Sequence, residues 1–139
     1  LRGTKVVVGD GPQLAELRAR YPQTVFAGMK SGEELANYYA AADVFVFPSR
    51  TDTFGLVLLE ALASGIPIAA YPVPGPLDVI DGSDAGCLND DLGMAVQEAI
   101  SIPAAVCRAR AQAFSWDRSA EQFVSNLHTI GAKNEPATL

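Results

Sequence analysis

The sequence is poor in the side chains that build metal centres and nucleophilic triads. It holds one histidine, His128, and two cysteines, Cys87 and Cys107, among 139 residues. A single histidine leaves too little material for a His-based triad or a multi-histidine metal site, so His128 is predicted to be structural or exposed. Two cysteines without metal-ligand spacing make no disulfide framework, so both are predicted to be buried thiols in a reducing compartment.

Positive charge and long apolar runs are also scarce. Ten Lys and Arg residues stand against sixteen Asp and Glu residues, which gives a net charge of −6. Without a basic cluster the chain is not expected to bind nucleic acid, and an anionic ligand must be held by backbone amides or a few cations. No apolar run approaches the roughly 20 residues that cross a bilayer, and the N-terminus lacks a signal-peptide pattern. These absences predict a soluble, cytoplasmic protein.

What the chain does contain is an alternation of short β-branched runs and helical patterns, which is typical of βαβ units and a parallel sheet. Strands are expected at 4–9, 24–28, 43–48, 67–71 and 85–89. Helices are expected at 13–21, 31–42, 54–64, within 72–82, and at 90–101, 103–114 and 115–130. We therefore predict an α/β fold, a Rossmann-like three-layer sandwich with a parallel sheet of about five strands. It would span residues 1–130, followed by a flexible tail at 131–139.

Three local patterns add finer predictions. Ser31 precedes a helical run and Glu34 follows three residues later, the arrangement of a capping box. The strand at 43–48 is apolar at nearly every position, as expected of a strand covered on both faces. Trp116 and Phe123 lie at helical spacing and are predicted to pack against the rest of the protein rather than to contact a ligand.

The loop 48–55, "PSRTDTFG", is the most informative of the loops that would follow the strands. In an open parallel sheet, ligands bind beyond the carboxyl ends of the strands, where helix N-termini converge. Gly55 lies next to the expected helix start and has no Cβ, so an anion could approach the backbone there. The free amides of the first helical turn and the positive end of the helix dipole would attract it. A pyrophosphate is the predicted occupant.

Two carboxylates flank this loop and its helix. Glu60 lies about five residues into the helix, roughly 7 to 8 Å along its axis, which is about the spacing from a diphosphate to its ribose. Asp52 would face a group beyond the phosphates. The alternatives are ordinary: an Asp before a helix often caps it, and a lone Glu in an apolar helix often reaches solvent at the edge.

Other loops offer weaker candidates. The segment "VVVGDGP" lacks G-x-G-x-x-G, so Gly9 and Gly11 are interpreted as a tight turn lining a cleft rather than as a dinucleotide fingerprint. Phe26 and Gly28 end the second strand, where they could line a flat pocket for a base or serve as a core aromatic and a turn glycine. Arg50 is the cation nearest the expected phosphate site; the alternative is a solvated or ion-paired surface group.

These motifs occur in the order of a known family. The segments "VVVGDGP", "VFAG" and "EELANYYAAADVFVFPSRTDTFGLVLLEALASGIPIAAY" resemble the C-terminal, nucleotide-sugar-binding half of retaining glycosyltransferases of family 4 (group 1), which have the GT-B fold. The resemblance covers roughly residues 4 to 130. In that family two acidic residues, usually glutamates, are separated by seven residues; here the pair is Asp52 and Glu60.

The resemblance implies a role for each matching residue. Glu60 would bind the donor ribose, Phe54 and Gly55 would offer backbone amides to the diphosphate, and Asp52 would contact the hydroxyls of the donor sugar as the catalytic-site residue. "VFAG" matches where the family places backbone around the base. The complete donor-binding set expected from both arguments is Gly9, Gly11, Phe26, Gly28, Arg50, Thr53, Phe54, Gly55, Leu56 and Glu60.

The resemblance also implies what lies outside this chain. A GT-B enzyme has an N-terminal acceptor-binding domain, and an Arg and a Lys reach the phosphates from the start of its C-terminal domain. The chain would then be a donor-binding domain, inactive by itself, with any peripheral membrane association made through the other domain. No metal and no cofactor are expected beyond the nucleotide diphosphate sugar, which is the substrate.

The expected reaction is transfer of a hexose from the nucleotide diphosphate sugar to a glycan, lipid or small molecule. The same architecture serves sugar-nucleotide epimerases and phosphorylases, and a nucleotide-sugar-binding module without turnover is the alternative from another class. A generic NAD protein is disfavoured because the glycine fingerprint is absent.

Overall fold

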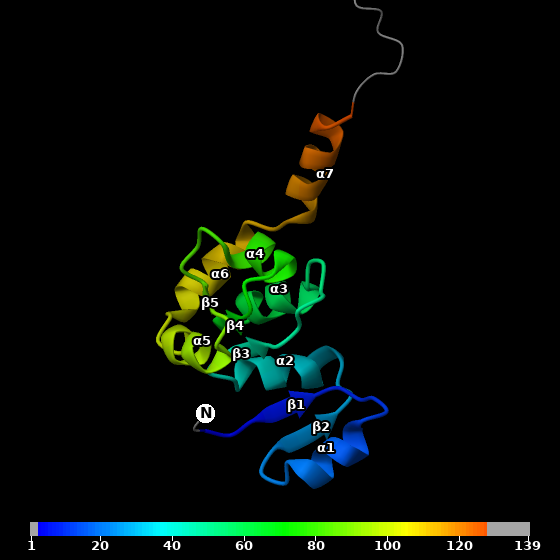
Figure 1. Cartoon of the computed structure of the whole chain (residues 1–139). Helices are drawn as coiled ribbons and strands as arrows, with labels where there is room; N and C mark the ends of the chain where they lie inside the picture. The colour runs from blue at the N-terminus through cyan, green and yellow to red at the C-terminus, as the bar shows by residue number, and fades with distance from the viewer. Residues whose placement is uncertain (1–2, 128–139) are drawn as a thin grey trace, which may run out of the picture.

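A computed structural model describes residues 3–127, in which five strands alternate with helices along the chain (Figure 1). The strands are β1 Val6–Val8, β2 Val25–Gly28, β3 Phe45–Phe47, β4 Ile68–Ala70 and β5 Gly86–Leu88. The helices are α1 Leu14–Arg20, α2 Gly32–Ala40, α3 Leu56–Ala63, α4 Pro74–Ile80, α5 Leu92–Ala99, α6 Ala104–Gln112 and α7 Trp116–Ser125. The predicted α/β class and strand number are confirmed. The tail expected at 131–139 and His128 lie outside the described residues.

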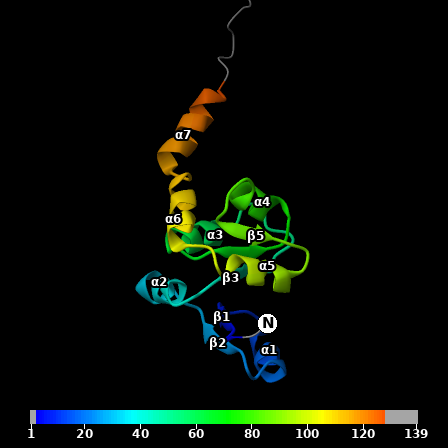
Figure 2. The same cartoon turned by 90° about the vertical axis from the view of Figure 1, so that its left-hand side faces the viewer.

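The strands form two parallel sheets rather than one. The smaller sheet pairs β1 with β2, and the larger has the order β3-β4-β5. Figures 1 and 2 both show β1 on the side of the small sheet that is nearer to β3. Strand pairing depends on neighbours in space, which sequence periodicity does not specify, so the single sheet expected from the alternation is divided here.

Within residues 3–127, each sheet ends in a strand edge without a paired strand, on the side toward the other sheet. The amide of Phe45 donates to Pro67, at 2.9 Å, so the backbone groups of Phe45 point toward β4. Backbone groups alternate along a strand, and those of Val46 therefore point away from β4. Likewise the amide of Gly9 donates to Gly28 on β2, at 2.9 Å, which turns the backbone groups of Val8 to the open side.

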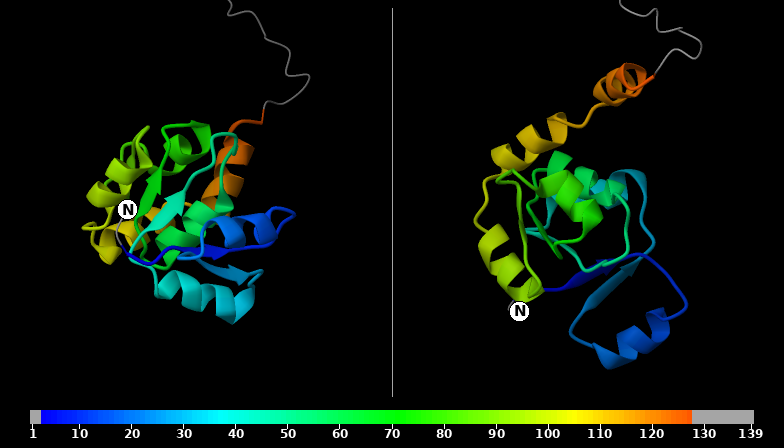
Figure 3. Two further views of the ribbon diagram at one scale, coloured as in Figure 1. Left: turned by 60° about the horizontal axis from the view of Figure 1, so that its bottom comes forward. Right: turned by 45° about the horizontal axis from the view of Figure 1, so that its top comes forward.

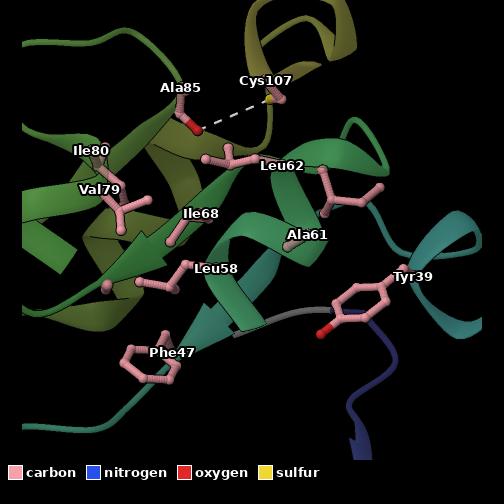
Figure 4. Close-up of a cluster of buried hydrophobic side chains, with 12 residues drawn as sticks. Tyr39, Phe47, Leu58, Ala61, Leu62, Ile68, Val79, Ile80, Ala85 and Cys107 are labelled. Carbon is pink, nitrogen blue, oxygen red and sulfur yellow. Dashed lines mark hydrogen bonds between the residues drawn. The ribbon is translucent and has the colours of Figure 1, made fainter. Parts of the chain in front are cut away.

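The hydrophobic core surrounds the larger sheet. Its largest fully buried side chains are Pro76 and, as Figure 4 shows, Leu58, Leu62, Ile68, Ile80, Val79 and Cys107. Leu58, Ala61 and Leu62 lie at positions i, i+3 and i+4 of α3, which places them on one helical face. Burying each large aliphatic side chain contributes about 1.5–3 kcal/mol. This core fixes α3 against β4 and α6, and so fixes the loop before α3.

The two cysteines differ in burial. Both are free thiols, as predicted. Cys107 on α6 is fully buried in the core, whereas Cys87 on β5 is only partly buried. The prediction of two buried thiols is therefore right for Cys107 and wrong for Cys87, because β5 lies at the edge of its sheet and its side chains are less completely covered.

Helices cover both faces of the central strand β4. One face belongs to the α3 cluster, while Ala69 packs with Ala95 and Ala99 of α5 on the other face. The three predicted layers are thus present around the larger sheet. The full cover expected for the strand at 43–48 is only partly observed, because Phe47 is buried but Val46 remains 36% exposed.

The two ends of the molecule are far less buried than its middle. The right-hand view of Figure 3 shows α1 and the small sheet at one end and α7 at the other, and neither α1 nor α7 has a buried residue. Trp116 is 90% exposed and Phe123 is 67% exposed, so their prediction as packing residues is wrong for the described part of the chain. Their spacing correctly predicts a helix, but it does not show whether another part of the protein covers the side chains.

The capping box expected at α2 is not formed. Ser31 is the N-cap residue as predicted, but its side chain makes no capping hydrogen bond. Glu34 instead pairs with Lys30, with 3.5 Å between Nζ and Oε1. The sequence pattern thus predicts where α2 begins, but it does not predict the side-chain rotamers of Ser31 and Glu34 that a capping box requires.

Candidate functional site: the loop before α3 and its two carboxylates

The start of α3 presents backbone amides that have no acceptor in the described part of the chain. Gly55 is the N-cap with φ of 76°, and no side chain caps the helix. The N–H groups of Gly55, Leu56 and Val57 find no hydrogen-bond partner among residues 3–127. Gly55 itself is buried, but Leu56 and Val57 are exposed, so this helix end is accessible to a ligand beside those two residues. An anion is the chemical group that such a helix start attracts.

Asp52 shapes the loop instead of capping α3. Its Oδ1 accepts the N–H of Phe54 at 3.1 Å, which folds the loop back on itself as an Asx turn. The alternative that Asp52 caps the helix is therefore wrong. The Phe54 amide, expected to be offered to a diphosphate, is already bound to Asp52 in this arrangement. Thr53 lies exposed between them.

The first turn of α4 packs against the loop before α3. Gly75 is buried, and a Cβ there would lie 3.0 Å from the carbonyl oxygen of Asp52 and 3.2 Å from the amide nitrogen of Phe54. The loop backbone and α4 are thus in direct contact, which holds the Asp52 turn in place. Phe54 adds an edge-on contact with Phe114, with ring centroids 6.2 Å apart.

Arg50 is held at the carboxyl ends of the larger sheet. Its guanidinium carbon lies 3.6 Å from the centroid of the Tyr71 ring, and its Nη1 is 3.8 Å from Oδ1 of Asp90. Tyr71 follows β4 and Asp90 follows shortly after β5, so Arg50 reaches from the loop across the next two strand ends. Arg50 is thus an ion-paired surface group, as the alternative expected, and it is also stacked on an aromatic ring.

Glu60 lies one turn further along α3 and has a partner that the sequence analysis did not find. The hydroxyl of Tyr39 on α2 donates to its Oε2 at 3.0 Å. Burial, followed by the hydrogen bond and the charge of Glu60, raises the pKa of Tyr39 above its usual range. A hollow of about 260 Å³ opens here, lined by Leu35, Ala36, Tyr39, Glu60 and Ser64. The carboxylate of Glu60 is therefore exposed to solvent, but one of its oxygens accepts a hydrogen bond from Tyr39.

The candidates from the first strands gather in a separate hollow of about 430 Å³ between β1, α1 and β2. It is lined by Gly9, Gly11 and Phe26, together with Val7, Val8, Asp10, Pro12, Gln13, Leu14 and Leu17. Gly28 does not line it, but its carbonyl accepts the amide of Gly9 at 2.9 Å and so joins the two strand ends. The hollow shares no lining residue with the one at Glu60.

The structure therefore brings the predicted residues into two groups. The first joins Asp52, Thr53, Phe54, Gly55, Leu56 and Glu60 on one loop and helix, with Arg50 at the start of that loop. The second joins Gly9, Gly11, Phe26 and Gly28. Sequence reasoning missed Tyr39 and Tyr71; the only available signal for Tyr39 was its helical spacing from Leu35, which puts it on the buried face of α2.

Two further properties concern metals and membranes. Residues 3–127 contain no group of three or more His, Cys, Asp or Glu side chains placed to hold a metal ion. Within the same residues, every helix is too short or too polar to cross a bilayer.

Comparison with known proteins identifies the family. The model of the family "Glycosyl transferases group 1" matches residues 3–103. The chain belongs to this family, and the resemblance drawn from the motifs is confirmed.

Relatives are similar to this chain over most of its length but are much longer. It is 34% identical to the alpha-monoglucosyldiacylglycerol synthase of Streptococcus pneumoniae over 88% of this chain and 30% of that protein. It is 42% identical to a GDP-mannose-dependent alpha-mannosyltransferase of Corynebacterium glutamicum over 61% of this chain and 21% of that protein. The chain thus spans less than a third of either relative.

Solved structures share the fold. The sucrose-phosphate synthase from Thermosynechococcus elongatus superposes with a TM-score of 0.68 at 29% identity, over 86% of this chain and 36% of that one. Anabaena HepE in complex with UDP gives a TM-score of 0.67 at 22% identity, over 88% of this chain and 41% of that one. The arrangement of strands and helices is that of GT-B glycosyltransferases.

Proposed function

We propose that residues 1–130 are the donor-binding domain of a retaining glycosyltransferase that moves a hexose from a nucleotide diphosphate sugar to a glycan, lipid or small-molecule acceptor. One observation carries the proposal. At the start of α3 the amides of Gly55, Leu56 and Val57 have no acceptor among residues 3–127, with Asp52 before them and Glu60 one turn after them. The family membership supports a transferase, and the relatives include a GDP-mannose-dependent enzyme.

In the proposed complex the diphosphate lies at the open amides of α3, where the helix dipole stabilises negative charge. Glu60 accepts hydrogen bonds from the ribose hydroxyls, and Asp52 contacts the hydroxyls of the sugar from the other side of the diphosphate. Arg50 adds positive charge at the neighbouring strand ends. The loops carrying Gly9, Gly11, Phe26 and Gly28 would enclose the base.

The transfer itself needs the departing diphosphate to be stabilised as the bond to the sugar breaks. Fixed backbone dipoles do this without reorganisation at the moment of reaction, which makes the α3 amides the main electrostatic element of the proposed site. We propose that no metal and no further cofactor take part. Arg50 is the cation that this loop carries, and we propose that additional cations reach the phosphates from elsewhere in the protein.

We further propose that an acceptor-binding domain of the same protein completes the enzyme, and that this chain alone turns over little or nothing. The relatives are about three to five times longer than the part they share with this chain, which leaves room for such a domain. Any peripheral contact with a membrane would be made through it. The free thiols of Cys87 and Cys107 support a cytoplasmic location, where cysteines stay reduced.

Calorimetric titration with UDP, GDP, ADP and NADH tests the proposal. We expect one nucleoside diphosphate to bind, NADH not to bind, and Glu60→Ala to weaken the binding at least about tenfold, as loss of hydrogen bonds to a charged group does. Glu33→Ala is the matched control, because Glu33 is an exposed glutamate on α2. Failure of all three nucleoside diphosphates to bind at millimolar concentration, or equal effects of the two substitutions, would contradict the proposal.

A further inference from the structure

We propose that Tyr39 is a positioning residue of the donor site, whose hydroxyl holds the Glu60 carboxylate in the orientation that accepts the ribose hydroxyls. The inference rests on the proposed function and adds to it a residue from another helix. Glu60 alone is an exposed side chain on α3, whereas the pair of Glu60 and Tyr39 is a fixed arrangement of α2 and α3.

The Tyr39 ring is immobilised by the core. Tyr39 is the buried residue of α2, and its ring lies 5.7 Å from that of Phe45, centroid to centroid. It belongs to the same cluster as Leu58 and Ala61 of α3 (Figure 4). A tyrosine has two side-chain torsions, and packing of the ring restricts both. The position of the hydroxyl is therefore set by the fold rather than by a ligand.

The hydrogen bond between the two side chains has a fixed direction. A tyrosine hydroxyl is protonated at physiological pH, and burial followed by the nearby carboxylate raises the pKa of Tyr39 further above that range. It has a single proton, which it donates to Oε2 of Glu60 at 3.0 Å. The oxygen of Tyr39 then retains lone pairs, and Oε1 of Glu60 has no donor among the described residues.

Tyr39 is the side chain that orients this carboxylate in the described part of the chain. Ser64 lies one turn further along α3, but its hydroxyl donates to the main-chain oxygen of Glu60 at 2.9 Å and not to the carboxylate. The ion pairs found among residues 3–127 join Lys30 to Glu34 and Arg50 to Asp90, and neither of them includes Glu60.

This arrangement prepares two acceptor atoms for a diol. Oε1 of Glu60 and the oxygen of Tyr39 belong to residues that line the same hollow of about 260 Å³. A free glutamate on an exposed helix face would lose rotamer entropy when it binds a ligand. A glutamate already oriented by Tyr39 loses less, which increases affinity for a ligand with vicinal hydroxyls.

The competing explanation is that the hydrogen bond only joins α2 to α3. The two roles differ in one respect. A purely structural bond affects every ligand equally, whereas a positioning bond affects only ligands that use the carboxylate. A nucleoside diphosphate and its 2′,3′-dideoxy counterpart separate the two, because the second has the same base and phosphates but lacks the hydroxyls.

The test titrates UDP and GDP, each with its 2′,3′-dideoxy counterpart, into the unaltered chain and into the variants Tyr39→Phe, Tyr38→Phe and Glu60→Ala. Tyr38→Phe is the matched control, because Tyr38 is the adjacent residue of α2 and its ring faces Lys30 instead, with Nζ 6.0 Å from the ring centroid. We expect Tyr39→Phe to reduce affinity for the ribonucleotide about tenfold and to leave the dideoxynucleotide unchanged. Tyr38→Phe should change neither.

The outcomes separate this inference from the proposed function. If Tyr39→Phe keeps the ratio of the two affinities while Glu60→Ala abolishes it, Tyr39 only joins the helices and the proposed function stands. If the unaltered chain binds neither nucleotide, or binds both forms equally, the roles of Glu60 and Tyr39 are both refuted. Thermal unfolding of each variant confirms that the compared proteins are folded.

Discussion

Arg50 lies over the ring of Tyr71, with its guanidinium carbon 3.6 Å from the ring centroid. The contact joins the loop before α3 to the segment after β4, so it fixes both the shape of that loop and the location of its cation. The ion pair with Asp90 is longer, at 3.8 Å, and both of its side chains are more than half exposed, which makes it a weak contributor.

The first prediction concerns this stacked pair. Tyr71→Ala should lower affinity for a nucleoside diphosphate about two- to fivefold, because a cation–π contact at an exposed site is worth about 0.5–1 kcal/mol. Tyr71→Phe keeps the ring and should bind like the unaltered chain. Titrations at low and high salt provide the measurement, and an equal loss in both variants would show that the ring is not what positions Arg50.

A second prediction separates the charge of Asp52 from its role in the loop. Asp52→Asn keeps an oxygen that can accept the Phe54 amide, whereas Asp52→Ala removes it. We expect Asp52→Asn to bind the nucleoside diphosphate normally but the nucleotide sugar several-fold more weakly, since only the sugar would contact this side chain. Asp52→Ala should weaken both. Equal binding of the nucleotide sugar by Asp52→Asn and the unaltered chain would argue against contact with the sugar.

The third prediction concerns the left-handed backbone at Gly55. Gly55→Ala should destabilise the fold by about 1–3 kcal/mol, because an L-residue at φ of 76° is strained and its Cβ would lie 3.1 Å from Cδ1 of Leu58. Gly82→Ala is the control, with φ of 69° and nothing within 4 Å of the added Cβ. Urea unfolding of both variants is the measurement. Gly55→Ala reports backbone strain together with crowding against Leu58, whereas Gly82→Ala reports backbone strain alone. Equal midpoints would mean that Leu58 moves aside freely.

A fourth prediction follows from the thiol of Cys87. Burial, followed by the hydrogen bond and the charge of Glu98, raises its pKa to about 11; Sγ of Cys87 and Oε2 of Glu98 are 2.7 Å apart. The folded protein therefore favours the neutral thiol, and alkylation by iodoacetamide should be slow at pH 8 and rise steeply toward pH 11.

The raised pKa of Cys87 also determines how the stability of the fold changes with pH. Because the thiol ionises more easily in the unfolded chain, its ionisation should destabilise the fold as the pH rises from about 9 to 11. Glu98→Gln should lower the pKa of Cys87 and speed its alkylation at pH 8. Glu121→Gln removes the same charge from an exposed position on α7 and serves as the control. An unchanged rate in Glu98→Gln would show that burial alone protects the thiol.

Much of the fold was predictable because it is encoded locally. Glycine and proline around 65–67 end α3, and the buried positions Leu58, Ala61 and Leu62 follow helical periodicity directly. The loop before α3 was found for the same reason, since its glycine and polar residues mark the end of a strand.

The parts that could not be predicted depend on contacts between distant segments. The hydroxyl of Tyr39 meets Glu60 only because α2 and α3 pack together, 21 positions apart in the chain. Arg50 was recognised as a cation near the site, but its stacking on Tyr71 depends on where β4 ends. Trp116 shows the converse case: its helix was predicted, yet periodicity could not say that no described residue would cover it.

The division of the strands into two sheets has a consequence for handling the protein. The backbone groups of Val8 and Val46 that point away from their sheets form hydrogen-bonding templates on strands with exposed valines, a feature that natural proteins usually protect against edge-to-edge association. In a concentrated solution of this chain alone, intermolecular β-pairing would compete with the monomer. A strand that occupied these edges would remove the tendency to aggregate and join the two sheets.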